Sequence, residues 1–292
     1  MELNVILYAL GANITFALGS QVYTHFSRSI SSVWMNCFKA LVAFLAFGLC
    51  ISITGSWHAI PLGYVALFLV SGSIGLGIGD IFLLKAFSLM GPGRTLLIFG
   101  FQPLIIGTLS YFILDQSIDS RKFWAIFFCI LCLGIMSLES YKKSGHWELK
   151  GIAMALVGMS LDSCGVIITR YTFDHNPGMD SMEGNFYRTM GALLVFMLLS
   201  TFHPFAFVQS FKSLGLKART FLIGGSLLGT FCSLGFYLKA MQSAHLASLA
   251  GLSITGIMFA SLFECLIEKR AFSRYLFGAF LCSLCGMKIM LF

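Results

Sequence analysis

Apolar stretches about as long as a bilayer-spanning helix recur along the whole chain. A transmembrane helix needs roughly 20 consecutive apolar residues, and we count ten such stretches in 292 residues. The connections between them leave no room for a sizeable soluble domain. Charged residues make up only 11% of the chain, against about 25% in soluble globular proteins. The sequence therefore predicts an all-α integral membrane protein with ten transmembrane helices and excludes a soluble enzyme.

Glycine, proline and polar clusters separate the predicted helices. Examples are Gly-Pro-Gly at 91–93 and His-Asn-Pro-Gly at 175–178. No basic segment precedes the first helix, so we expect this helix to be retained rather than cleaved as a signal. The helices are predicted at residues 3–24, 33–53, 62–89, 93–113, 122–139, 151–171, 183–201, 219–241, 245–267 and 272–291.

The two halves of the chain repeat one another at a shift of about 150 residues. The matched segments are 36–39 (NCFK) with 185–188 (NFYR), 84–86 with 238–240 (both LKA), Asp115 with Glu268, Ser120-Arg121 with Ser273-Arg274, and Cys129/Cys132 with Cys282/Cys285. Each half has five predicted helices, an odd number, so the second copy must cross the membrane in the opposite sense. We expect two inverted five-helix repeats, residues 1–143 and 144–292, with the functional site between them.

These features resemble the drug/metabolite transporter superfamily, specifically its ten-helix EamA type. The resemblance rests on the five-helix repeat, the Lys-Ala step near the end of the third helix of each half, Pro103 in the fourth helix and the acid after that helix. It implies a multi-pass transporter of the cytoplasmic (inner or plasma) membrane, with a central site bounded by helices 1–4 and 6–9. The second half has Gly256 where Pro103 maps, which puts a paired gating bend in doubt.

Ionisable side chains within the predicted helices are the first candidates for that site. A charge at the bilayer centre costs at least about 2.5–3.5 kcal/mol, so it is expected where it has a function or a partner. Asp162 lies near the middle of the sixth helix, and Asp80 about two thirds along the third. Neither has an acidic counterpart in the other half, which favours specialisation for a ligand or a proton. The alternatives are a structural ion pair for Asp162 and, around Asp80, close helix packing at the neighbouring glycines.

Four basic residues recur as symmetric pairs, Lys39 with Arg188 and Lys85 with Lys239. Each lies within about two turns of a predicted helix end, where a long side chain can reach the membrane interface. The alternative is that they line a cavity, where they pair with the acids or hold an anionic substrate group.

Large uncharged polar residues are the remaining candidates for lining the predicted site. Most intramembrane serine and threonine hydroxyls bond their own backbone, so the amides are the better candidates. They are Asn13, Asn36, Asn185 and Gln102, and the tyrosines that could contact a substrate are Tyr111, Tyr187 and Tyr237.

The predicted function is transport of small polar metabolites such as amino acids, with export favoured and proton coupling through Asp162 or Asp80 left open. The alternative is an anionic, phosphorylated or carboxylated metabolite held by Lys85, Lys239 and Arg188. An intramembrane enzyme or a scaffold is less favoured, because the six histidines lie at helix ends or in connections and no hydrolase or P-loop motif is present.

Partners and cofactors follow from the same reading. The two C-x-x-C pairs lie among apolar residues without histidine or carboxylate nearby, so we expect packing rather than a metal site. We expect no cofactor and no nucleic acid. The expected partners are a small-molecule substrate and the lipid bilayer, with monomer and homodimer both open.

Membrane orientation is left open by two conflicting arguments. Basic residues crowd the connections after the odd-numbered predicted helices. By the positive-inside rule these connections are cytoplasmic and both termini are outside. The family resemblance implies cytoplasmic termini instead.

Overall fold

The computed structural model describes residues 3–115, 148–267 and 274–291, with isolated positions between 124 and 145. Every regular element in this described part is a helix. The predicted fifth helix, 122–139, falls largely outside it, and so do Cys129, Cys132 and Glu268. The repeat matches at these positions therefore stay predictions.

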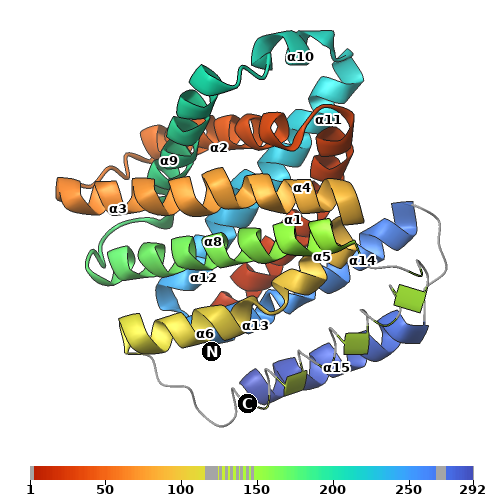
Figure 1. The fold of residues 1–292 in the computed structure, drawn as a ribbon. Coiled ribbons are helices and arrows are strands. Elements are labelled where there is room, and N and C mark those ends of the chain that lie inside the picture. The colour runs from red at the N-terminus through yellow and green to blue at the C-terminus, as the bar shows by residue number, and fades with distance from the viewer. Residues whose placement is uncertain are drawn as a thin grey trace.

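Helical elements follow one another with short connections (Figure 1). In the first half they are α1 (Leu3–Ser29), α2 (Ser32–Thr54), α3 (Leu62–Gly72), the π-helical segment η1 (Ser73–Gly79), α4 (Asp80–Met90), α5 (Pro92–Phe99) and α6 (Gln102–Leu114). In the second half they are α8 (Leu149–Asp174), α9 (Ser181–Phe202), α10 (Phe207–Ser213), α11 (Leu216–Ser226), the π-helical segment η2 (Leu227–Cys232), α12 (Ser233–Ser243), α13 (Leu246–Leu252), α14 (Ile254–Ile267) and α15 (Arg274–Leu291).

Six spans in the described residues are long and apolar enough to cross a membrane. They become seven if α9 and α10, which are bent by 99° relative to each other, count as one broken span. The predicted helix 93–113 is not one of them, because it is divided into α5 and α6. The all-helical membrane fold is thus confirmed, and the prediction of ten crossing helices is met only in part.

The helix predicted at 93–113 breaks at Gly100 and Phe101, just before Pro103. A proline inside a helix lacks the N–H for one backbone bond, and its ring clashes with the carbonyl four residues earlier. The helix predicted at 245–267 also breaks, at Ser253, although Gly256 stands where the proline maps. The expectation of a continuous helix was wrong at 93–113, whereas in the second half Ser248–Ile267 remains one span with an interruption at Ser253 that involves no proline.

The third helix of each half contains a π-helical segment where one continuous α-helix was expected. These segments lie at glycine crossings between the halves. A Cβ atom on Gly19 of α1 would lie 2.4 Å from Cα of Gly229 in η2, and one on Gly165 of α8 would lie 3.3 Å from Cα of Gly75 in η1. Glycine therefore permits a backbone approach that a side chain would block.

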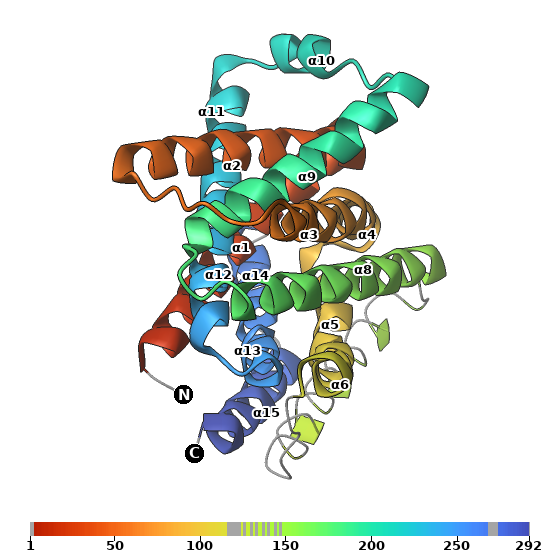
Figure 2. The ribbon, with the colours of Figure 1, turned by 90° about the vertical axis from the view of Figure 1, so that its left-hand side faces the viewer.

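Helix packing interleaves the two halves. Helix α1 packs on α12, η2 and α14, and α8 packs on α4 and η1. Helices α2 and α9 pack on each other, and Figures 1 and 2 show α2, α4 and α8 side by side. The interior is consequently built by residues from both halves.

Candidate functional site

A cavity of about 150 Å³ lies at the junction of the two halves. Its wall takes residues from α1, α2, η1 and α4–α6 and from α8, α9, η2, α12 and α14. Sites for drug-sized ligands are about 300–1,000 Å³, so this cavity has room for a small solute only. The predicted candidates that line it are Asn13, Lys39, Asp80, Gln102, Asp162 and Arg188.

Lys39 and Asp80 form an ion pair in the cavity wall. Their side chains are only 4% and 9% exposed, respectively. The Lys39 ammonium also lies 5.3 Å from the centroid of the Tyr23 ring, a cation–π distance. Because each charge has its partner within the protein, this part of the wall is electrically balanced.

Asp162 comes from the middle of α8 and faces Gln102 at the start of α6. The Gln102 amide donates a hydrogen bond of 2.7 Å from Nε2 to Oδ2 of Asp162. No lysine or arginine in the described residues forms an ion pair with this carboxylate. Within the described part of the chain, the hydrogen-bond partner of Asp162 is therefore an uncharged amide from the other half.

Arg188 on α9 is 1% exposed and lines the cavity. Two of its three guanidinium nitrogens, Nε and Nη1, have no hydrogen-bond partner in the described structure. Buried polar groups are nearly always paired, and a buried charge without a partner is costly. Arg188 is therefore the least satisfied group of the wall.

Asn36 and Asn185 are fully buried but lie behind the wall rather than in it. Asn36 Nδ2 donates to the carbonyls of Leu76 and Gly77, each at 2.9 Å. Asn185 Nδ2 donates to the carbonyl of Leu234, also at 2.9 Å. Leu76 and Leu234 line the cavity, so the two asparagines hold the backbone that forms its wall.

Asn13 lines the cavity, but its amide nitrogen already donates hydrogen bonds within the protein. Its Nδ2 donates to the Leu252 carbonyl at 2.9 Å and to Oγ1 of Thr255 at 2.7 Å. These bonds fasten α1 to the break between α13 and α14.

Lys85 and Lys239 are exposed, and neither lines the cavity. Tyr111 is 53% exposed and lies away from it as well. Tyr237 does line the cavity. The structure therefore brings Arg188 together with Asp162, Asp80 and Lys39, but not with the two lysines of the predicted anion site.

Sequence analysis did not single out Thr230 and Ser233, which also line the cavity. Thr230 lies in the π-helical segment η2, which no sequence pattern indicated. The internal repeat could have pointed to Thr230. Its register aligns Thr230 with Leu76 and Tyr237 with Leu83, and all four residues line the cavity.

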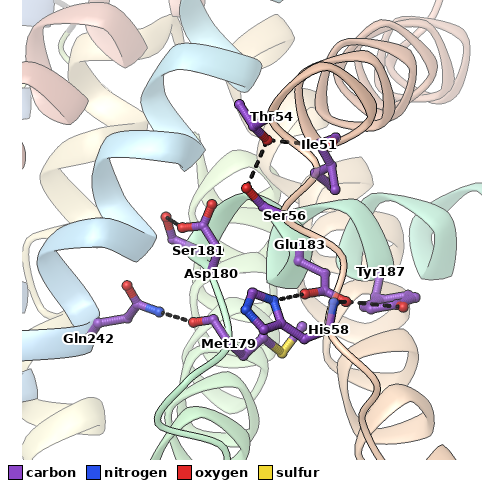
Figure 3. A network of polar contacts seen from close by, with 10 residues as sticks. All are labelled: Ile51, Thr54, Ser56, His58, Met179, Asp180, Ser181, Glu183, Tyr187 and Gln242. Atoms are coloured by element: carbon purple, nitrogen blue, oxygen red, sulfur yellow. Dashed lines mark hydrogen bonds and ion pairs between the residues drawn. The ribbon is translucent and has the colours of Figure 1, made fainter.

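The two ends of α2 mark opposite faces of the helix bundle. We call the face of the bundle at the end of α2 the A face. There the connection at 55–61 meets the start of α9 (Figure 3). His58 Nδ1 lies 3.0 Å from Oε2 of Glu183, whose side chain is 0% exposed, and the Tyr187 hydroxyl lies 3.4 Å from Oε1. Glu183 thereby links the second half to the first.

At the start of α2, here called the B face, other contacts join the halves. Glu264 of α14 accepts a 3.2 Å hydrogen bond from the Gly93 amide of α5. The Trp34 indole donates to the Phe207 carbonyl of α10 at 3.1 Å. A second, polar cavity of about 660 Å³ opens beside Glu264, between the ends of α1, α4, α5 and α14.

Comparison with protein families finds a match in the first half of the chain. Residues 3–138 match the model of the EamA-like transporter family. The match covers the first half of the chain, which is thus similar to that family. The apolar helices are those of a multi-pass membrane protein.

The whole fold is similar to a solved crystal structure of another protein. The similarity covers 99% of this chain and 96% of the other, with a TM-score of 0.76 and 14% sequence identity. At this identity the likeness concerns the fold alone. No curated protein matches the chain in sequence.

Proposed function

We propose that this chain is a secondary transporter that moves small polar metabolites, amino acids or related compounds, by alternating access around the central cavity. Export across the cytoplasmic membrane is the direction we favour. The observation that carries the proposal is the small cavity at the junction of the halves, whose wall holds an acid and a base that form no ion pair within the described part of the chain. A neutral apolar solute would leave both charges uncompensated.

The two halves, 1–143 and 144–292, are proposed to be inverted structural repeats. Matched positions of the two halves occupy the same cavity wall, which supports this. The pairs are Phe16 with Asp162, Lys39 with Arg188, Leu76 with Thr230, Asp80 with Leu234, Leu83 with Tyr237 and Gly100 with Ser253. Sites at the interface of such repeats are typical of transporters that rock one repeat against the other.

Contacts between the halves at the two faces are the proposed gates. On the A face His58 of the first half meets Glu183 of the second. On the B face Gly93 of the first half meets Glu264 of the second. In alternating access one set of contacts opens while the other stays closed.

Proton coupling, if present, is assigned to Asp162 rather than Asp80. The Asp80 carboxylate is already neutralised by Lys39, whereas the partner of Asp162 among the described residues is an uncharged amide. A proton and a cationic substrate group would compete for the Asp162 carboxylate. Asp162→Asn is expected to remove the pH dependence of transport.

An anionic metabolite is the weaker alternative. Lys85 and Lys239 lie outside the cavity, so only Arg188 remains of the three cations proposed for that site. Asp162, which has no ion-pair partner among the described residues, also lines the cavity and would repel a multiply charged anion.

Flux into proteoliposomes tests the proposed function. A panel of radiolabelled amino acids and phosphorylated metabolites would be compared for the wild type, Arg188→Gln and the double variant Lys85→Gln/Lys239→Gln. We expect amino-acid flux to fall at least about tenfold in Arg188→Gln, equivalent to ~1.4 kcal/mol, and to stay near wild type in the exposed-lysine control. Flux of phosphorylated compounds alone, or equal loss in both variants, would contradict the proposal.

A further inference from the structure

We infer that the cavity binds its ligand as a zwitterion, with the ligand carboxylate at Arg188 and the ligand ammonium at Asp162. The inference rests on the proposed function, because it assigns the ligand contacts of the same cavity. It names two specificity-determining residues and the charges that the substrate must carry.

The charge balance of the wall is the first step. Four residues with full charges line the cavity, two basic and two acidic. Lys39 and Asp80 neutralise each other. No ion pair joins Arg188 to Asp162 in the described structure. The cavity therefore presents one positive and one negative group, each without an ionic partner.

Arg188 is suited to a carboxylate. A guanidinium presents five N–H donors in a planar fork that matches the two oxygens of a carboxylate. Because Nε and Nη1 have no hydrogen-bond partner among the described residues, these donors stay free for a ligand. The 1% exposure of Arg188 makes bulk water a poor substitute for that ligand.

Asp162 is suited to an ammonium group. A carboxylate has about four lone-pair positions, and the Gln102 amide occupies one of them at Oδ2. Oδ1 lies near the backbone of Gly75 in η1, where an added Cβ atom would be 3.4 Å away. Among the described residues Oδ1 has no hydrogen-bond donor, so the carboxylate keeps acceptor capacity.

A ligand with both charges fits this wall better than a ligand with one. A simple anion would satisfy Arg188 and leave the half-buried Asp162 without a counter-charge, and a simple cation would do the reverse. Leaving one partner of a buried charge pair uncompensated is strongly destabilising. A small zwitterion satisfies both groups, and the cavity of about 150 Å³ limits its size.

Matched ligands and variants test the assignment by calorimetry on the detergent-purified full chain. The proteinogenic amino acids are screened first, and the tightest binder is then compared with its α-amide and its N-acetyl derivative. We expect the wild type to bind each derivative at least about tenfold more weakly. Lys85→Gln is the control and should reproduce the wild type.

The variants separate the two ends of the ligand. Arg188→Gln should weaken the parent amino acid about tenfold or more without further weakening the α-amide, which lacks the carboxylate. Asp162→Asn should do the same for the parent without further weakening the N-acetyl derivative. Arg188→Lys, which keeps the charge but not the fork, should fall between wild type and Arg188→Gln.

The outcomes distinguish the inference from the proposed function. If a derivative binds as tightly as its parent, or Arg188→Gln weakens parent and amide equally, the zwitterion assignment is wrong. If no amino acid binds while other small metabolites are transported, the assignment fails and the transport proposal stands. If amino acids bind as expected without flux in proteoliposomes, the transport proposal fails instead.

Discussion

At the scale of single residues, the position of Arg188 depends on a glycine. A Cβ atom on Gly72 of α3 would lie 1.8 Å from the Arg188 carbonyl oxygen. Helix α3 therefore touches α9 backbone to backbone at the residue that carries the guanidinium. The absence of a side chain at position 72 sets how far Arg188 reaches into the cavity.

Gly72→Ala is expected to push α3 and α9 apart and to displace Arg188. Overpacking of this kind costs about 1–3 kcal/mol, so the melting temperature and the affinity for ligand should both fall. Gly63→Ala in the same helix is the control, because no atom lies within 4 Å of a Cβ there. Equal melting temperatures for the two variants would contradict the close approach.

Asn36 supports the wall from behind, and its removal should loosen η1. Asn36→Ala leaves the carbonyls of Leu76 and Gly77 without their side-chain donor. An unsatisfied buried polar group costs about 1–3 kcal/mol. Thermal unfolding of the purified protein should show this loss, whereas Asn4→Ala, at an exposed position, should leave stability unchanged.

At the scale of elements, the interruptions in the two halves show that a helix can be interrupted at the matched position without a proline. Helices α5 and α6 are separated near Pro103, and α13 and α14 are separated without a proline. The break in the second half is fastened instead by Asn13, which bonds the Leu252 carbonyl. Packing between the halves can therefore hold such a break where local sequence does not impose one.

Pro103→Ala is expected to keep the break between α5 and α6. Flux should stay within about threefold of wild type, a change of less than ~1 kcal/mol in the barrier. Proteoliposome flux and melting temperature would be measured together. A well-folded Pro103→Ala protein with at least tenfold lower flux would show that proline itself is required.

The contact between His58 and Glu183 should stabilise the A face. Glu183→Gln keeps the shape of the side chain and removes its charge, while the carboxylate is buried and His58 is 43% exposed. We expect a loss of about 1–2 kcal/mol, because hydrogen bonds to charged groups are the stronger ones. Asp180→Asn is the nearby control, because Oδ1 of Asp180 accepts a hydrogen bond from the adjacent Ser181. Both variants would be compared by thermal unfolding. An equal loss of stability in the two would contradict the role of Glu183.

At the scale of the whole molecule, hydropathy and the internal repeat predicted which segments are helical and which positions meet. Lys39 and Arg188 match in the repeat and do line one cavity. Lys85 and Lys239 match equally well and are exposed. Lys85 is five residues after Asp80, which at 100° per residue turns it about 140° away on the same helix. Repetition alone does not say which helix face turns inward.

The sequence also could not predict which charged residues form ion pairs. Lys39 could have paired with either acid, and the structure joins it to Asp80. That choice depends on the approach of α2 to α4 and on π-helical segments that no sequence pattern indicated. The unpartnered state of Arg188 follows from the same packing and becomes visible only in three dimensions.

Alternating access at the central cavity is tested most directly by locking the two faces. In a background with the nine native cysteines replaced, cysteine pairs at positions 58 and 183 or at 93 and 264 would be joined by a short cleavable crosslinker in proteoliposomes. We predict that either crosslink alone stops amino-acid exchange and that cleavage restores it, while the crosslinking reagent does not inhibit the single-cysteine variants. Continued exchange with complete crosslinking at either face would contradict the account.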